Sequence, residues 1–331
     1  MEGVKHTKHM PNLILTTKCQ RNCEYCFAKD SMISESEFSL DNFIRAVKFL
    51  STGPKNVNLL GGEPTLHKNF CDMLELLLKK DFRVQVFTNG MVKNETLDSI
   101  ISVINKITLK KDQLYFSVNV REEKYRSKLE TKLQERFFDY MGKLSYPSFV
   151  IHDININLLF LKDIVNRFNT DNTIKLNLAH PIINGDNKYL SPENYKSVAK
   201  NIIDLVDITP DIYKRFDCGF VLCMFSIDEI NRLNKDEKND FIFSCDNPID
   251  IYPDLSVTNC FVLSKLFKSS ILDFNDIYDL TNYFYEGFMT PTGIFGKKCN
   301  ECSFFRQICS GGCKGFYTPK SEVNYDKSNL E

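Results

Sequence analysis

Hydrophobic and polar positions follow two alternating periods over roughly the first two hundred residues of the chain. Short β-rich runs are separated by segments in which apolar residues recur at helical spacing, several of them after an Asn, Ser or Thr that can cap a helix. The predicted strands are 12–17, 57–60, 83–88, 114–120, 154–160 and 173–179. The predicted helices are 40–50, 69–80, 94–104, 131–141 and 192–206. Repeated strand–helix units predict an α/β fold with a parallel sheet.

Six such units form either a partial barrel or a doubly wound sheet, and periodicity does not choose between the two. After about residue 210 the alternation ends, Gly, Asn and Pro become frequent between the helical stretches, and eight of the twelve cysteines follow. We therefore expect a strand–helix domain over 10–210 and a metal-organised, cysteine-rich domain over 211–331.

The overall charge argues against one class of partner. With 42 Lys and Arg against 43 Asp and Glu, the formal net charge is -1, so the chain has no basic field to hold a nucleic acid. The N-terminal residues lack the apolar core of a signal peptide, and no stretch reaches the roughly 18 apolar residues of a membrane span. We expect a cytoplasmic protein with neither a nucleic-acid nor a membrane partner.

In a reducing compartment, disulfides do not explain twelve cysteines, so metal binding is the leading interpretation. Cys19, Cys23 and Cys26 directly follow the first predicted strand, at the strand end where parallel α/β folds place their chemistry. Three thiolates can hold a four-iron cluster and leave one iron without a protein ligand. The alternative is a zinc knuckle completed by His6, His9 or a distant residue, but zinc ligands usually come in two short pairs.

The spacing C-x3-C-x2-C, with the aromatic residue Tyr25 before the last cysteine, resembles the signature of the radical S-adenosylmethionine (SAM) enzymes. In that family the open iron chelates the amino and carboxylate groups of SAM. One electron from the reduced cluster then cleaves SAM to methionine and a 5'-deoxyadenosyl radical that abstracts hydrogen. The resemblance implies a partial (β/α)6 barrel, similar to a TIM barrel, over 10–210, and an electron donor such as flavodoxin or ferredoxin.

A second motif follows the second predicted strand. Gly61, Gly62, Glu63 and Pro64 match the family's GGEP element, which holds the amino group of SAM. Glycines let the backbone approach a ligand closely, a carboxylate can accept hydrogen bonds from an ammonium group, and proline stiffens the turn. Alone, these four residues are typical of an ordinary turn. Next to the cysteine motif, they favour a SAM site.

Further resemblances are weaker. The segment FTNG at 87–90 is similar to a TNG element of the family, Ser117 and Asn119 stand where ribose contacts are frequent, and Arg126 stands where the SAM carboxylate is often held. Each of these side chains is also typical of a strand end or of a solvated helix. The histidines at 67, 152 and 180 have no spacing partner, and we expect ordinary surface or core roles for them.

The C-terminal cysteines resemble the SPASM domain, an appendage of radical SAM enzymes that houses auxiliary four-iron clusters. The matching cysteines are Cys245, Cys260, Cys299, Cys302, Cys309 and Cys313. The chain departs from the pattern in three ways. Leu255 replaces a glycine, the gap before Cys309 has six residues instead of five, and no cysteine follows Cys313.

The resemblance also implies how these ligands are shared between clusters. One auxiliary cluster would take Cys223, Cys245, Cys260 and Cys313, with Cys218 as an alternative to Cys223. A second would take only three ligands, Cys299, Cys302 and Cys309. Cys71 falls within an apolar helical stretch and is expected to pack in the core. A zinc ribbon is the alternative for this region, although its two C-x2-C pairs differ from the spacing present here.

Family members with this second domain often modify peptides or proteins, and others act on small molecules. We therefore expect hydrogen abstraction from a peptide or protein side chain or α-carbon. The alternatives are a small-molecule substrate and a non-enzymatic iron–sulfur protein that transfers electrons. The predicted barrel begins within a dozen residues of Met1, so we expect no N-terminal peptide-recognition domain. Phe261 stands where sulfatase-maturing members place an aspartate, so we do not expect that oxidation.

Overall fold

The computed structural model describes 10–29, 35–182, 186–217, 219–235, 239–245, 248–265, 268–287 and 293–316 of the chain. Over these residues the strands form one eleven-stranded sheet in the order β11-β10-β9-β1-β2-β3-β4-β5-β6-β7-β8. The strands are β1 (Asn12–Ile14), β2 (Asn56–Leu60), β3 (Arg83–Thr88), β4 (Leu114–Asn119), β5 (Ser145–Ile151), β6 (Thr173–Leu178), β7 (Tyr213–Phe216), β8 (Asn239–Asp240), β9 (Ile249–Ile251), β10 (Ser256–Asn259) and β11 (Lys268–Ser270). The α-helices are α1 (Leu40–Leu50), α2 (Phe70–Lys79), α3 (Asn94–Lys106), α4 (Lys128–Met141), α5 (Phe160–Phe168), α6 (Tyr195–Ile208), α7 (Ile227–Leu233), α8 (Ile277–Gly287) and α9 (Lys297–Asn300).

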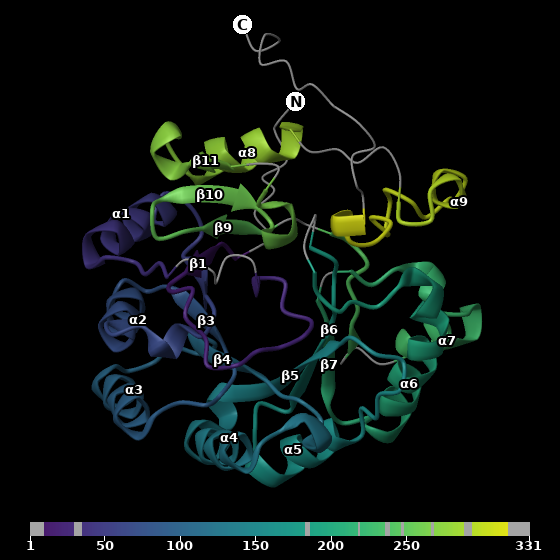
Figure 1. Cartoon of the computed structure of the whole chain (residues 1–331), viewed down its shortest axis with the longest axis horizontal. Helices are drawn as coiled ribbons and strands as arrows, with labels where there is room; N and C mark the ends of the chain where they lie inside the picture. Colours follow the sequence, from purple (N-terminus) through teal and green to yellow (C-terminus); the bar gives the residue numbers. More distant parts are fainter. Residues whose placement is uncertain are drawn as a thin grey trace, which may run out of the picture.

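Strands β1 to β8 are parallel, and each pairs with the next strand along the chain. A doubly wound sheet would reverse this order at a switch point. Figure 1 shows the sheet curving round a centre, with helices α1 to α6 along its outer side. Among the described strands, the two end strands β8 and β11 are not neighbours in the sheet. The fold is therefore an open barrel, and the predicted partial barrel is confirmed.

The helices form where their apolar residues repeat at helical spacing, which gives each one a face to bury. In α1 the Ser39 side chain caps the first turn by accepting a hydrogen bond from the Asn42 amide. The residues that α1 buries are Phe43, Ala46, Val47 and Leu50. The predicted helix 40–50 coincides with α1. The other four predicted helices correspond to α2, α3, α4 and α6, with ends that differ by less than a helical turn.

The fifth predicted strand, 154–160, is wrong. The structure places the fifth strand at β5, where every residue except Val150 is buried, and the segment predicted as a strand leads instead into α5. The alternation Ile-Asn-Ile-Asn at 154–157 is typical of a strand with one solvent-exposed face. An inner strand of a parallel sheet is instead buried on both faces. Side chains in the connection bind backbone amides instead of a sheet partner. Asp153 accepts from the Asn155 amide and Asn157 from the Leu159 amide, both at 2.9 Å.

The C-terminal part of the chain continues the barrel's sheet. Strand β9 pairs in parallel with β1, and β10 and β11 follow in antiparallel order. Figure 1 shows β9 to β11 and α8 beside β1 and α1, whereas α9 lies on the side of α6 and α7. The amide of Ile277, at the start of α8, donates to the Thr52 hydroxyl at 3.1 Å. Strands β7 and β8 also lie beyond residue 210 in the same sheet, and the domain boundary at 210 stays a prediction.

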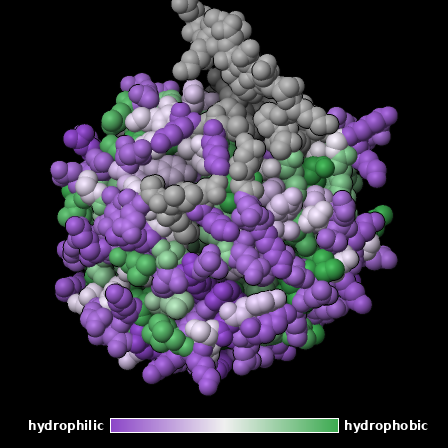
Figure 2. Space-filling model, in the orientation of Figure 1, coloured by the Kyte–Doolittle hydropathy of each residue, from purple (hydrophilic) through white to green (hydrophobic). Residues whose placement is uncertain are grey.

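Most of the apolar side chains of the described residues are buried. Figure 2 shows a face that is mostly hydrophilic, with hydrophobic residues scattered over it. The large apolar side chains lie instead in one main core, which extends from Leu13 in β1 to Phe284 in α8. No helix within the described residues is both long and apolar enough to cross a membrane.

Candidate functional site

The first cysteine cluster lies on one loop after β1. Cys19, Cys23 and Cys26 are free thiols and each is partly buried. The loop folds back on itself, and the Cys26 amide donates to the Cys23 carbonyl at 3.1 Å. Burial first, and then the charges of Cys23 and Cys19, raise the pKa of the Cys26 thiol to about 11. The three thiols therefore lie close enough to influence one another.

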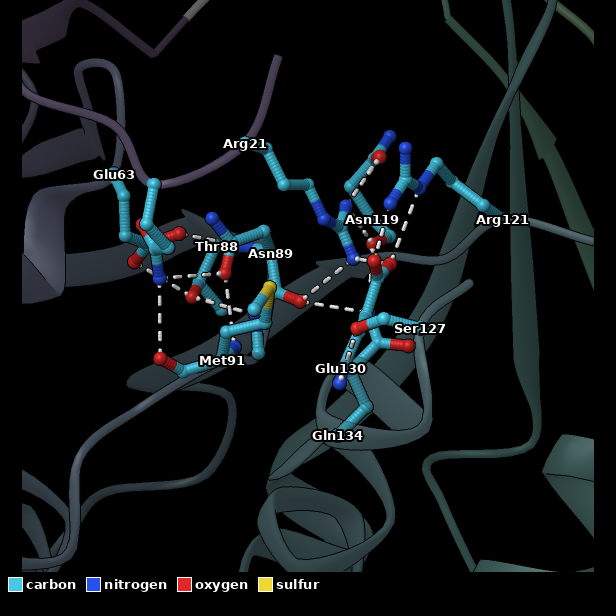
Figure 3. Close-up of polar contacts among 12 residues, drawn as sticks. Arg21, Glu63, Thr88, Asn89, Met91, Asn119, Arg121, Ser127, Glu130 and Gln134 are labelled. Carbon is cyan, nitrogen blue, oxygen red and sulfur yellow. Dashed lines mark hydrogen bonds and ion pairs between the residues drawn. The ribbon is translucent and has the colours of Figure 1, made fainter. Parts of the chain in front are cut away.

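Arg21, between the first two cysteines, fastens this loop to the barrel (Figure 3). Its guanidinium donates to the Asn119 carbonyl at 2.8 Å and to the Asn89 carbonyl at 3.2 Å. It also forms an ion pair of 2.6 Å with Glu130, and both side chains are almost completely buried. Because Asn119 ends β4 and Asn89 follows β3, one side chain holds the cysteine loop to two strands and to α4.

The Glu130 carboxylate serves two arginines. It lies in the first turn of α4, after the N-cap Ser127, and also accepts from the guanidinium of Arg121. Both arginines depend on Glu130 as their counter-ion. Without it the buried Arg21 guanidinium would have no opposite charge beside it, which is costly. Sequence analysis missed Arg21, Arg121 and Glu130. The available signal was Glu130's place on the buried face of α4, in phase with Phe137, but the predicted helix began after it.

Gly61 and Gly62, in the turn after β2, pass directly over the backbone that leads into the cysteine loop. The Gly62 amide donates to the Thr16 carbonyl, and the Glu63 amide to the Lys18 carbonyl, both at 2.8 Å. A Cβ atom on Gly61 would lie 2.3 Å from the Thr16 oxygen, and one on Gly62 would lie 2.3 Å from the Lys18 oxygen. The contact between two backbone segments by itself requires glycine here.

Glu63 uses its carboxylate largely inside the protein. The side chain is 0% exposed and accepts from the Thr65 hydroxyl at 2.7 Å, the Thr88 hydroxyl at 2.8 Å and the Asn89 amide at 2.6 Å. Burial raises the pKa of Glu63, and these hydrogen bonds lower it. Glu63 thus joins its turn, continued by the buried Pro64, to the TNG segment after β3. Its expected contact with an ammonium group stays a prediction.

Two of the predicted cofactor-binding residues meet beside the loop. The Tyr25 hydroxyl donates to Asn119 Oδ1 at 3.3 Å, and Arg21 donates to the same oxygen at 3.1 Å. The Tyr25 ring is almost buried, and its centroid lies 4.5 Å from that of His152. The end of β4 is therefore in contact with the cysteine loop, as a shared site requires.

Ser117 and Arg126 lie on either side of Asn119 in the sequence. Ser117 is buried in β4 and pairs in register with Tyr146 of β5. Arg126 follows a short 3-10 helix, Glu123–Tyr125, and burial lowers its pKa although nearby carboxylates, Glu130 first, oppose this. Its Nε atom is buried without a hydrogen-bond partner among the described residues. The ligand contacts expected of both residues stay predictions.

The C-terminal cysteines form two groups. Burial raises the pKa of the Cys260 thiol well above its usual value, and the charges of Asp250, Cys313 and Cys245 raise it further, so these four residues lie together. Asp250 is fully buried and accepts from Asn12 Nδ2 at 2.5 Å, and burial raises its pKa to about 7. Sequence analysis missed this carboxyl group.

The second group contains Cys299, at α9, together with Cys302, Cys309 and Cys223. Burial raises the pKa of the Cys223 thiol, and the charges of the other three cysteines raise it further. The resemblance implied a different place for Cys223, next to Cys260. Cys218 lies outside the described residues. Cys71, in α2, packs against the core as expected.

None of these groups is arranged round one ion. Among the described residues, no three His, Cys, Asp or Glu side chains are placed to share a single metal ion. In a four-iron cluster each cysteine binds a different iron, so the thiols stand farther apart than they do round zinc. The loops therefore bring thiols together in groups without forming a closed single-ion site.

Comparisons with known proteins support the family resemblance of the cysteine loop. Residues 13–145 match the Radical SAM superfamily. The chain is 27% identical over 170 residues to the 7-carboxy-7-deazaguanine synthase of Clostridium acetobutylicum, covering 51% of this chain and 71% of that protein. It is 30% identical over 111 residues to the tungsten-containing aldehyde ferredoxin oxidoreductase cofactor-modifying protein of Pyrococcus furiosus, covering 33% of this chain and 30% of that protein. The chain thus spans less than a third of the second relative's length.

Solved structures resemble the chain over nearly its whole length. SuiB of Streptococcus suis bound to S-adenosylmethionine has a TM-score of 0.63 and 14% identity, covering 92% of this chain and 73% of that chain. The anSMEcpe structure with bound AdoMet and the Kp18Cys peptide has a TM-score of 0.62 and 18% identity, covering 94% of this chain and 92% of that chain. At these identities the likeness concerns the fold, and its coverage includes the C-terminal region as well as the barrel.

Proposed function

Since this chain belongs to the Radical SAM superfamily, we propose that it cleaves SAM reductively and directs the resulting radical at a peptide or protein substrate. The observation that carries the proposal is the contact between the three-cysteine loop and the Gly61–Gly62 turn. Two motifs far apart in the sequence are joined by backbone contacts at the carboxyl ends of β1 and β2. Active sites of parallel α/β barrels lie at this end of their strands.

The residues fit a four-iron cluster with SAM. Cys19, Cys23 and Cys26 are free thiols on one loop, and the buried Arg126 Nε has no hydrogen-bond partner among the described residues, which suits a residue that awaits a ligand carboxylate. When bound, this pair of cofactors supplies a 5'-deoxyadenosyl radical for hydrogen abstraction. In this proposal Tyr25, Ser117 and Asn119 line the SAM site.

The protein's contribution is a rigid support for both motifs. Arg21 ties the cysteine loop to Glu130, and Glu63 ties the GGEP turn to Thr88 and Asn89. The two tethers converge on Asn89, whose carbonyl accepts from Arg21 and whose amide donates to Glu63. Loop and turn are therefore held in one fixed geometry, which preorganises a site for its ligands.

A peptide or protein substrate is the leading proposal because solved structures that contain a bound peptide resemble nearly the whole chain. The SuiB structure with precursor peptide SuiA and the anSMEcpe structure with the Kp18Cys peptide resemble 92% and 94% of this chain. A small-molecule substrate is the second candidate. It is favoured by the relationship to 7-carboxy-7-deazaguanine synthase, which covers 51% of this chain. We propose in addition that the C-terminal cysteines hold auxiliary clusters, and that a flavodoxin or ferredoxin supplies the electron.

The central step can be tested with purified protein. Anaerobically reconstituted protein reduced with dithionite should convert SAM to 5'-deoxyadenosine and methionine, measured by chromatography. The Cys19/Cys23/Cys26→Ala variant should lose this activity. The Cys71→Ala variant, which changes a cysteine on the core side of α2, should retain it. Cleavage of SAM that persisted in the triple variant would contradict the assignment of these ligands.

The substrate class can be tested without knowing the substrate. Extract of cells grown in deuterated medium, from which SAM has been removed, should increase 5'-deoxyadenosine formation and place deuterium in that product. Digestion of the extract with an immobilised protease should remove both effects if the substrate is a peptide or protein. Stimulation and label that survived proteolysis, and that passed a small-molecule filter, would favour the small-molecule alternative.

A further inference from the structure

Cys223 is separated from the other C-terminal cysteines in sequence but lies against their loop. It sits in a short 3-10 helix, Leu222–Met224, between β7 and α7, and the residue is exposed although its thiol is partly covered by the neighbouring loop. The residues on either side, Val221 and Met224, are buried in the main core. The backbone at 221–224 is therefore fixed by packing against the core, while Cys223 itself is not part of that core.

Two contacts place this helix beside the loop 293–313. A Cβ atom on Gly312 would lie 3.1 Å from Val221 Cγ1 and 2.8 Å from Ile294 Cδ1, so these side chains meet over the glycine. On the other side, the Phe225 ring lies 6.2 Å from the Phe243 ring, and the Phe243 carbonyl accepts from the Ser310 amide at 2.9 Å. Cys223 is thus held between two contacts that reach the residues flanking Cys309 and Cys313.

The loop then separates its last two cysteines. Gly311 and Gly312 adopt left-handed backbone angles, with φ of 80° and 92°, which reverse the chain between Cys309 and Cys313. Beyond the reversal, the Gly315 amide donates to the Cys313 sulfur at 3.4 Å. A Cβ atom on Gly315 would lie 2.3 Å from Val262, which follows Cys260. Cys313 therefore joins the Cys260 group, and Cys309 stays on the side of Cys223.

We propose that Cys223 completes a four-thiolate site with Cys299, Cys302 and Cys309. The proposal rests on the auxiliary clusters of the proposed function and assigns Cys223 to the opposite group from the one implied by the family pattern. It adds a fourth thiolate to the three of Cys299, Cys302 and Cys309. The incomplete set moves to the other group, where the described cysteines are Cys245, Cys260 and Cys313, beside the buried carboxyl group of Asp250.

The ligand sets can be assigned by combining cysteine substitutions in the Cys19/Cys23/Cys26→Ala protein, which retains only the C-terminal sites. Iron and sulfide content and Mössbauer spectra are the readouts. Cys223→Ala and Cys302→Ala should each remove the same share of iron, and the double variant should lose no more than either single one. Combining Cys223→Ala with Cys260→Ala should instead remove the iron of both groups. Cys71→Ala serves as the control that loses none.

Three results would overturn the proposal. Cys223→Ala with unchanged iron content and an unchanged Mössbauer spectrum excludes Cys223 as a ligand, because a cluster that survived on three thiolates would show one altered iron. Losses that add in the Cys223/Cys302 pair but not in the Cys223/Cys260 pair return Cys223 to the Cys260 group. A parent triple variant without iron removes the auxiliary clusters altogether, whereas SAM cleavage by the unmodified protein would still stand. The two failures are therefore distinguishable.

A conservative substitution provides a second readout that does not depend on complete loss of a cluster. In the full chain with its clusters loaded, Cys223→Ser keeps a side-chain oxygen that can bind iron, and it should change the Mössbauer parameters of the same cluster that Cys302→Ser changes. A change confined to the cluster that Cys260→Ser alters would overturn the proposal.

Discussion

The two cysteine regions of this protein are built in opposite ways. The N-terminal loop takes its three thiols from eight consecutive residues and fastens them to a regular barrel through the buried Arg21–Glu130 pair. The C-terminal groups take theirs from residues between 223 and 313, and hold them on short helices and in the loops between them. The barrel supplies the geometry of the first region, whereas in the second the metal itself is expected to supply much of it.

The described part of the C-terminal loop shows why. Between 293 and 316 its only α-helix is the four-residue α9, and Phe304 and Ile308 are 49% and 55% exposed. The barrel, by contrast, buries apolar residues from each of the strands β1 to β7 in one continuous core. Four experiments test this contrast.

Removal of iron should have the largest effect, and it should be confined to one region. Anaerobic chelation should accelerate amide hydrogen exchange over 293–316 by about two orders of magnitude or more, because ligation supplies most of the folding free energy of small metal-organised segments. Exchange in β2 to β6 should change little. Exchange mass spectrometry with and without metal measures both. Equal protection of 293–316 in the two states would show that the loop is stable by packing alone.

Glu130→Gln should produce the next largest effect. It keeps the shape of the side chain but leaves the buried guanidinium of Arg21 without its carboxylate, which should lower the free energy of unfolding by about 3–5 kcal/mol. The matched control is Glu135→Gln on the same helix, whose ion pair with Arg167 is exposed and should contribute less than about 1 kcal/mol. Denaturant titration measures both. Similar small losses would show that Arg21 does not depend on this carboxylate.

Gly62→Ala and Gly53→Ala should separate a rigid contact from a compliant one. At each glycine a new Cβ atom would meet another atom at 2.3 Å, but that atom is the Lys18 carbonyl oxygen for Gly62 and a methyl group of Ile277 in α8 for Gly53. We expect Gly62→Ala to cost about 1–3 kcal/mol and to weaken SAM binding, because backbone cannot move aside. Gly53→Ala, between the barrel and α8, should cost less than about 1 kcal/mol because Ile277 can change rotamer. Denaturation and SAM titration distinguish them, and equal costs would contradict this interpretation.

Acid should destabilise the barrel by a smaller amount through His67. Its Nε2 donates to the Phe38 carbonyl at 2.9 Å and its Nδ1 accepts from the Asn69 amide at 3.1 Å, which describes a neutral ring, and burial lowers its pKa. As pH falls below roughly 6.5, the unfolded chain binds a proton that the folded ring does not. Stability should then fall, by at most about 1.4 kcal/mol for each pH unit.

The five histidines all lie at or before residue 180, so this acid loss belongs to the barrel and not to the C-terminal cysteine region. Denaturant titration between pH 5 and 8 should show a flatter profile for His67→Gln than for the unmodified protein. An unchanged profile would assign the titration to another group.

The sequence predicted those parts of the fold that depend on local periodicity. The helix 40–50 was located to the residue because its buried face repeats at helical spacing and Ser39 caps it. The fifth strand was misplaced because β5 is buried on both faces and contains Pro147, while the nearby Ile-Asn alternation gives a stronger period-two signal. Periodicity also could not choose between barrel and doubly wound sheet, since that choice depends on which strands pair.

The sequence by itself also located the three thiols of the first site. Cys19, Cys23 and Cys26 are so close along the chain that they meet on one loop in almost any fold, and the GGEP turn was recognisable for the same reason. Only the tertiary structure paired Arg21 with Glu130, turned the Glu63 carboxylate inward and set Cys223 beside Cys309. The spacing of residues predicts which side chains a short loop brings together. Contacts between residues that are distant in sequence depend on how helices and strands pack, and a short sequence pattern does not predict that packing.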